Sequence, residues 1–189
     1  MNLLSIPFMI VVLVLINEVR NYRLLRKSIF LYECCNVKFY RYRGKKDDDN
    51  AITITSFFGN GIVLLSDSVS NSVIYHELGH LRQKKKLYLF LITFAAAFAI
   101  AFSYDVVLLI LLLLVYKMFF AHLEREADLY AYTIHNVKYN TQKATRPERK
   151  IARLKAWIFD LHPPDWVRTR EEYYDRRKNI ICLFLEDVF

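Results

Sequence analysis

Five consecutive residues, His76-Glu77-Leu78-Gly79-His80, hold side chains that could do chemistry together. In a helix, residues four positions apart lie on one face, about one turn apart. Both imidazoles could therefore bind one metal ion, and Glu77 could reach a water molecule on that ion. This is what zinc-assisted hydrolysis needs, because zinc lowers the pKa of its water to about 7 and a carboxylate can then take the proton. The alternative is a pair of histidines on an ordinary amphipathic helix.

The residues around this motif predict a helix over about 71–86. Ser70 or Asn71 could supply the oxygen that caps its first backbone donors. Gly79 costs about 1 kcal/mol in a helix relative to alanine. Its presence therefore indicates that another backbone or the metal site comes close.

A third protein ligand is expected in the acidic run Glu124-Arg125-Glu126-Ala127-Asp128. Glu124 and Asp128 are four apart, so both face one side of a second helix. One could bind the metal, and the other could accept a hydrogen bond from the far nitrogen of a ligating histidine. Glu126 is expected to point elsewhere, into solvent. The alternative, a charged helix start favoured by the macrodipole, explains one acidic residue but not the pairing with the first motif.

Together these motifs resemble those of the HtpX-like and CAAX-prenyl-protease-like family of membrane zinc endopeptidases, a gluzincin group. HELGH and EREAD occur in that order on either side of a long apolar stretch. Asn50-Ala51 opens a strand-like run ahead of the HExxH segment, as in that family. His162-Pro163-Pro164, with Arg168 after it, resembles the family's C-terminal His-Pro…Arg element. The similarity covers about residues 50–168.

The resemblance implies one Zn²⁺ per chain and three protein ligands to it, His76, His80 and Glu124. Glu77 would be the general base and acid. Asp128 would be the hydrogen-bond partner of a histidine ligand.

His162 and Arg168 match the positions that stabilise the oxyanion of the tetrahedral intermediate in that family. A donor aimed at developing negative charge contributes about 3 kcal/mol. The alternative is that His-Pro ends a helix and that Arg168 is an exposed arginine.

Apolar residues make up 54% of the 189 residues and are gathered in blocks, over 3–16 and 87–116. As one helix the second block would be about 45 Å long, against about 30 Å of hydrocarbon. A single crossing would also place HELGH and EREAD on opposite sides of the membrane. The block is therefore expected to turn back near Ser103-Tyr104-Asp105 as a transmembrane hairpin. The alternative is a dry hairpin buried in a soluble oligomer.

The predicted fold is an α+β membrane protein with about three transmembrane helices. An N-terminal span over 1–19 precedes a mainly helical, zincin-type catalytic domain over 20–86 and 122–189, and the hairpin over 87–121 is inserted in that domain. Strand-like patterns over 37–42, 51–55 and 62–65, with a turn at Gly59-Asn60-Gly61, predict a small antiparallel sheet beside the HExxH helix. Residues 180–185 could be a strand or an interfacial helix.

Charges beside the apolar blocks predict an integral membrane protein with its N-terminus outside and its catalytic domain in the cytoplasm. Basic residues follow the first block and flank the hairpin, whose tip has Asp105 and no basic residue. The first block has no basic start and no small-residue cleavage site, so it is expected to stay attached. Cys34, Cys35 and Cys182 form no metal pattern and need no disulfide in a reducing compartment.

The net charge of +8 indicates attraction to anionic headgroups and not to nucleic acid, because the basic residues lie beside apolar blocks. The expected partners are the lipid bilayer and polypeptide substrates at the membrane, and the oligomeric state stays open. The expected function is zinc-dependent hydrolysis of peptide bonds in membrane or membrane-associated proteins, in protein quality control. The alternatives are a sensor-type membrane gluzincin that cleaves one dedicated regulator, and a non-catalytic interaction protein that keeps the fold.

Overall fold

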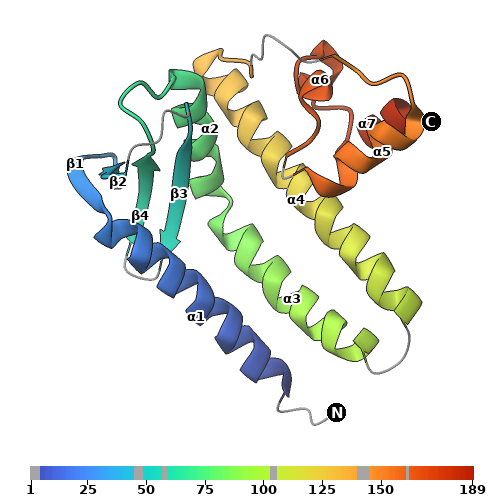
Figure 1. The fold of residues 1–189 in the computed structure, drawn as a ribbon, viewed down its shortest axis with the longest axis horizontal. Coiled ribbons are helices and arrows are strands. Elements are labelled where there is room, and N and C mark those ends of the chain that lie inside the picture. Colours follow the sequence, from blue (N-terminus) through green and yellow to red (C-terminus); the bar gives the residue numbers. More distant parts are fainter. Residues whose placement is uncertain (1–4, 45–48, 57–58, 103–105, 140–144, 161) are drawn as a thin grey trace.

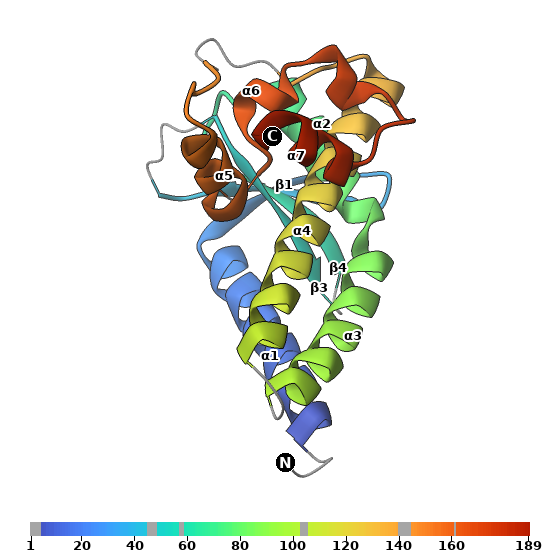
Figure 2. The same cartoon turned by 90° about the vertical axis from the view of Figure 1, so that its right-hand side faces the viewer.

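The structure is a computed structural model that describes residues 5–44, 49–56, 59–102, 106–139, 145–160 and 162–189. It is a mixed α+β fold, as expected. The long helices α1, α3 and α4 extend toward one end of the molecule, and the sheet, α2 and the C-terminal helices gather toward the other (Figures 1 and 2). The elements are, in chain order, α1 (Ser5–Arg26), β1 (Ser28–Cys34), β2 (Val37–Tyr42), β3 (Ala51–Ser56), β4 (Gly59–Leu64), α2 (Asn71–Arg82), α3 (Lys84–Phe102), α4 (Val106–His135), α5 (Lys150–Phe159), α6 (Asp165–Arg168), the 3₁₀ helix η1 (Glu171–Tyr174) and α7 (Ile180–Val188).

The four strands form one sheet in the order β1-β2-β4-β3. The β1–β2 and β3–β4 pairs are antiparallel, but β2 and β4 are parallel, so the expected all-antiparallel sheet is wrong at its centre. The expected turn at 59–61 is also wrong, because these residues belong to β4 and pair with β3. A Cβ on Gly61 would lie 2.9 Å from the Lys38 carbonyl oxygen of β2. Glycine therefore permits the close β2–β4 approach.

The predicted helix over 71–86 is two helices that meet at Gln83. The Gln83 backbone N–H donates to the His80 carbonyl and ends α2. Its side chain turns inward, where Nε2 donates to the Leu123 carbonyl of α4 at 2.8 Å. Ser70 stands at the N-cap position as expected, but its hydroxyl contacts Ser72 and makes no capping bond.

The second apolar block, over 87–116, folds back as predicted, with α3 and α4 packed side by side. Phe90 of α3 stacks on Phe119 of α4 with ring centroids 3.6 Å apart. The expected bend at 103–105 lies outside the described residues. Helix α4 continues from the apolar arm through Glu124 to His135, so no break separates the arm from the second motif.

Within the described residues one helix, Val107–His135, is long and apolar enough to cross a membrane, so the expectation of about three spans is not supported. Only 11% of its apolar window is buried inside the protein, unlike the core helix of a soluble domain. Helix α3 begins with three lysines, which shorten its apolar part. Helix α1 is polar in its second half, where Asn17 and Asn21 donate to the Thr55 carbonyl of β3.

The C-terminal elements pack on α4 around the fully buried Trp157 and Tyr173. Residues 180–185, left open between strand and helix, lie in α7. Asp187 of α7 is fully buried, and its carboxylate accepts hydrogen bonds from two indoles and ion pairs from two arginines. These donors are Trp157, Trp166, Arg146 and Arg170, at 2.9 to 3.1 Å.

Helices α2 and α4 touch at Gly79 and Ala127. A Cβ on Gly79 would lie 2.7 Å from the Ala127 Cα and 2.9 Å from its carbonyl oxygen. Both atoms belong to the backbone and cannot rotate away. A second backbone therefore does approach Gly79, as its helical position predicted.

We expect Gly79→Ala to destabilise the protein by about 2 kcal/mol, because overfilling a packed contact costs about 1–3 kcal/mol. The sign is informative, since the same change in an open helix would stabilise by about 1 kcal/mol. The measurement is chemical unfolding of the detergent-solubilised protein, with Thr93→Ala at an exposed position of α3 as the control. A Gly79→Ala protein as stable as the wild type would contradict this packing.

Candidate metal centre

The two sequence motifs meet where α2 packs on α4. His76 and His80 lie one turn apart on α2, with their Nε2 atoms 3.0 Å apart. Glu124 of α4 faces both rings, with Oε2 3.2 Å from His76 Nε2 and Oε1 3.4 Å from His80 Nε2. The three expected ligands therefore converge on one point.

These separations fit a zinc ion. In a tetrahedral site with bonds of about 2.0–2.1 Å, neighbouring ligand atoms are about 3.3 Å apart. Two imidazoles and a carboxylate are a donor set that zinc uses in catalytic sites. Glu124 Oε2 is also buried without a hydrogen bond in the described part of the chain, as suits an oxygen that binds a cation.

His162 joins the same cluster from the loop before α6. Its Nε2 lies 3.3 Å from Glu124 Oε2, and its side chain is 47% exposed. His76, Glu124 and His162 form one group that could hold a metal, and His76, Glu77 and His80 form another. His162 therefore lies beside the expected ligands, and its oxyanion role stays a prediction.

Asp128 lies behind His76, one turn along α4 from Glu124. Its Oδ1 is 2.7 Å from His76 Nδ1, and the residue is 3% exposed. A proton on Nδ1 that is donated to Asp128 leaves Nε2 free to bind a metal. The structure thus puts Asp128 where the resemblance implies a partner for a histidine ligand.

Arg168 is placed differently from either expectation. It is buried, and its Nε and one terminal nitrogen donate to both oxygens of Asp128 at 2.8 and 2.9 Å. Its guanidinium also lies 3.6 Å from the centre of the Tyr139 ring. The reading as an exposed arginine is wrong. Since Asp128 takes these donors, the geometry favours a positioning role through Asp128 and His76 over the expected oxyanion role.

Glu77 lies beside the paired histidines and is held by β3. Its Oε2 accepts hydrogen bonds from the Thr53 backbone N–H at 2.7 Å and from the Thr53 hydroxyl at 2.6 Å. Glu77, His76 and His162 line a cavity of about 310 Å³. A carboxylate fixed at the edge of a cavity and beside a metal site can exchange a proton with a water molecule there.

Three contacts at this centre were not anticipated from the sequence. Thr53 orients Glu77, and Tyr173 donates its hydroxyl to Asp128 Oδ2 at 2.9 Å. Gln83 Oε1 lies 3.0 Å from His80 Nδ1 and can accept its proton in a hydrogen bond. This leaves His80 Nε2 free to bind a metal, as Asp128 does for His76. Thr53 and Gln83 carried a weak signal, because one lies in a strand beside the motif and the other follows His80 by three residues.

Glu126 points away from the centre, as expected. It is not simply solvated, however, because Lys86 of α3 pairs with its Oε1 at 2.7 Å. This ion pair ties the start of α3 to α4.

Burial and charge act in opposite directions on His76. Burial alone lowers the pKa of His76, but the neighbouring carboxylates of Asp128 and Glu124 outweigh it and raise the pKa to about 10. His76 is therefore protonated at neutral pH in the metal-free protein, and metal binding must release that proton. At the rim, burial lowers the pKa of His162.

No family model, curated protein or solved structure matches the chain. The likeness to the HtpX-like group therefore stands on the motifs and their order along the sequence.

We expect Asp128→Asn to weaken zinc binding by about 10–100-fold, the usual effect of losing the hydrogen-bond partner of a ligating histidine. Chelator competition on the purified protein measures this affinity. Tyr173→Phe is the graded control, since it removes one neutral donor from the same carboxylate and should cost about 1 kcal/mol of stability with little loss of zinc. Equal zinc affinity in Asp128→Asn and the wild type would exclude the proposed positioning of His76.

Proposed function

We propose that this protein is a zinc-dependent membrane endopeptidase of the HtpX-like type. The observation that carries the proposal is the convergence of His76, His80 and Glu124 with donor atoms 3.0–3.4 Å apart. Glu77 beside them and Asp128 behind them supply the two further roles that a hydrolytic zinc site needs. A purely structural zinc site needs no further carboxylate at a cavity beside its ligands.

Zinc, when bound, supplies a Lewis acid that polarises a carbonyl and makes water acidic near pH 7. The chain's own residues supply the proton transfers and the orientation. Glu77 takes a proton from the attacking water as the water oxygen bonds to the peptide carbon. It returns that proton to the amine as the carbon–nitrogen bond breaks. His162, at the rim of the cavity, is the candidate donor to the oxygen on which charge develops.

Substrates are proposed to be membrane or membrane-associated polypeptides. The metal ligand Glu124 lies on the same helix as the one candidate span, so the centre is held close to the bilayer. Strand β3 is an edge of the sheet and holds Glu77 through the Thr53 backbone N–H. The Thr55 carbonyl on the same edge accepts from Asn17 and Asn21 of α1, so β3 serves to position Glu77. Protein quality control is the proposed role.

A sensor-type peptidase that cleaves one dedicated regulator uses the same centre and is the first alternative. A non-catalytic interaction protein is the second. The cavity lined by Glu77 favours an enzyme over the second alternative, since it places a carboxylate beside the candidate metal ligands where a water molecule could reach it.

We expect Glu77→Gln to lower proteolysis by about 10²–10⁴-fold, because the amide cannot accept the proton. Zinc content and the unfolding midpoint should stay close to the wild type, since Glu77 is not a proposed ligand. Comparing the membrane proteomes of cells with either form should identify fragments that disappear with Glu77→Gln. Many lost fragments would indicate quality control, and one would indicate a dedicated regulator.

The matched control is Glu126→Gln, which removes the same charge from a residue that faces Lys86. It should cleave at the wild-type rate. If Glu77→Gln keeps every wild-type fragment and the cellular activity, the protein is not a peptidase and the interaction alternative gains support.

The proposed orientation puts the catalytic domain in the cytoplasm, and the native thiols can report it. Cys34, Cys35 and Cys182 are all free and exposed. A membrane-impermeant maleimide should therefore label the wild-type protein in intact cells only after permeabilisation. A variant with these three replaced by serine and with Asn2→Cys should label without permeabilisation. The reverse pattern would show the opposite orientation.

A further inference from the structure

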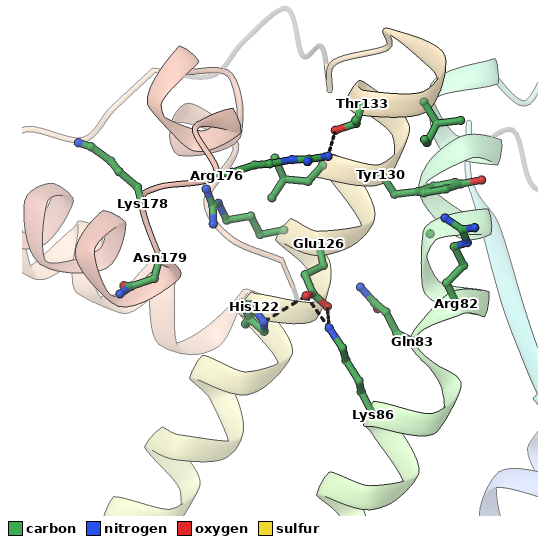
Figure 3. A pocket seen from close by; sticks show the side chains of 14 residues that line it. Arg82, Gln83, Lys86, His122, Glu126, Tyr130, Thr133, Arg176, Lys178 and Asn179 are labelled. Carbon is green, nitrogen blue, oxygen red and sulfur yellow. Dashed lines mark hydrogen bonds and ion pairs between the residues drawn. The ribbon is translucent and has the colours of Figure 1, made fainter.

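A second cavity lies between α2, α4 and the segment after η1, and none of its lining residues lines the cavity at the metal centre. Its volume is about 530 Å³. Figure 3 shows its walls: α2 and the start of α3 on one side, α4 behind, and residues 176–179 on the other. It is the larger of the two cavities and has no part in the proposed hydrolysis.

The lining of this cavity is strongly basic. Five of its fourteen residues are lysine or arginine, and one, Glu126, is a carboxylate. Three of the five cations already have partners within the protein. Lys86 pairs with Glu126, Lys178 pairs with Glu186, and Arg125 donates to backbone carbonyl oxygens of the η1 segment.

Arg82 and Arg176 are the two that remain, and no carboxylate pairs with either among the described residues. Arg82 lies over the Tyr130 ring at 4.9 Å, and Arg176 donates to the Thr133 hydroxyl at 3.0 Å. They project into the cavity from its opposite walls (Figure 3). Planar guanidinium groups bind phosphate oxygens through paired N–H donors, so arginines on both walls of one cavity suit a phosphate group.

The position of the cavity identifies the molecule that would bring the phosphate. Lys86 and His122 line it where the apolar arms of α3 and α4 begin and end. The outer face of the α4 arm is exposed and apolar, with Leu111 52% and Leu113 55% exposed. A basic cavity at the end of apolar helices is the arrangement that binds lipid headgroups.

We propose that this cavity binds the phosphate of an anionic phospholipid headgroup between Arg82 and Arg176, with the acyl chains along the α3–α4 hairpin. The site is separate from the metal centre and does not depend on hydrolysis. It would hold one lipid per chain and fix the height of the hairpin in the bilayer.

The experiment uses the full chain in a neutral detergent, where no charged bilayer surface contributes. Native mass spectrometry would count retained phosphatidylglycerol, with phosphatidylcholine as the zwitterionic comparison. We expect one retained phosphatidylglycerol and little phosphatidylcholine. The double variant Arg82→Gln/Arg176→Gln should bind phosphatidylglycerol about 30-fold more weakly, since each arginine near an anionic lipid contributes about fivefold.

The control is Arg23→Gln/Arg26→Gln, which removes the same charge from exposed positions of α1 outside the cavity. It should retain the lipid as the wild type does. All forms should keep their zinc and their far-ultraviolet circular dichroism, which separates this site from the metal centre and from misfolding. Equal losses in both double variants, or no loss in either, would overturn the proposal. Displacement of the lipid by millimolar inorganic phosphate or glycerol phosphate would overturn the lipid as ligand and assign the site to a soluble phosphate.

Discussion

The carboxylate of Asp128 is the interaction on which the rest of the candidate centre depends. Burying a charged carboxylate costs several kcal/mol unless it is paired and fully hydrogen-bonded. Asp128 meets this condition only by drawing partners from three other elements: His76 of α2, Arg168 of α6 and Tyr173 of η1. Helices α2 and α4, which hold the candidate ligands, and the C-terminal segment therefore have to assemble together.

Asp187 is a second buried carboxylate with partners from several elements, at the other end of the C-terminal segment. Its buried carboxylate gathers two indole N–H donors and two arginines, and so fixes α5, α6 and α7 against one another. Arg168 also belongs to α6, so the contacts of Asp187 that hold α6 in place also hold Arg168. Arg168 in turn holds Asp128, which orients His76. Asp187, which lies outside the candidate metal centre, thus supports the geometry of the candidate ligands.

The helical repeat was enough to predict which residues would gather at the centre. Contacts between elements that are far apart in the sequence limited the prediction. The helical repeat puts His76 above His80 and Glu124 above Asp128, and the close approach at Gly79 followed from its place in that helix. Local spacing marked Thr53 and Gln83 only weakly, because their roles arise from where β3 and the α2–α3 break lie in space. Alternation likewise marks a strand but not its neighbour, so β1 and the parallel β2–β4 pair were missed. Fewer spans qualify among the described residues than expected, because the polar second half of α1 packs on the sheet and α3 begins with three lysines.

The unbroken course of α4 has a geometric consequence for any chemistry at Glu124. At 1.5 Å per residue, Glu124 lies only about 4.5 Å along the axis beyond Ala121, where the apolar arm ends. No intervening loop can stretch or swing to change that interval. The helix therefore fixes the distance between Glu124 and the end of the apolar arm. In the peptidase proposed above, this distance would select peptide bonds by their height above the hydrocarbon before their side chains are recognised.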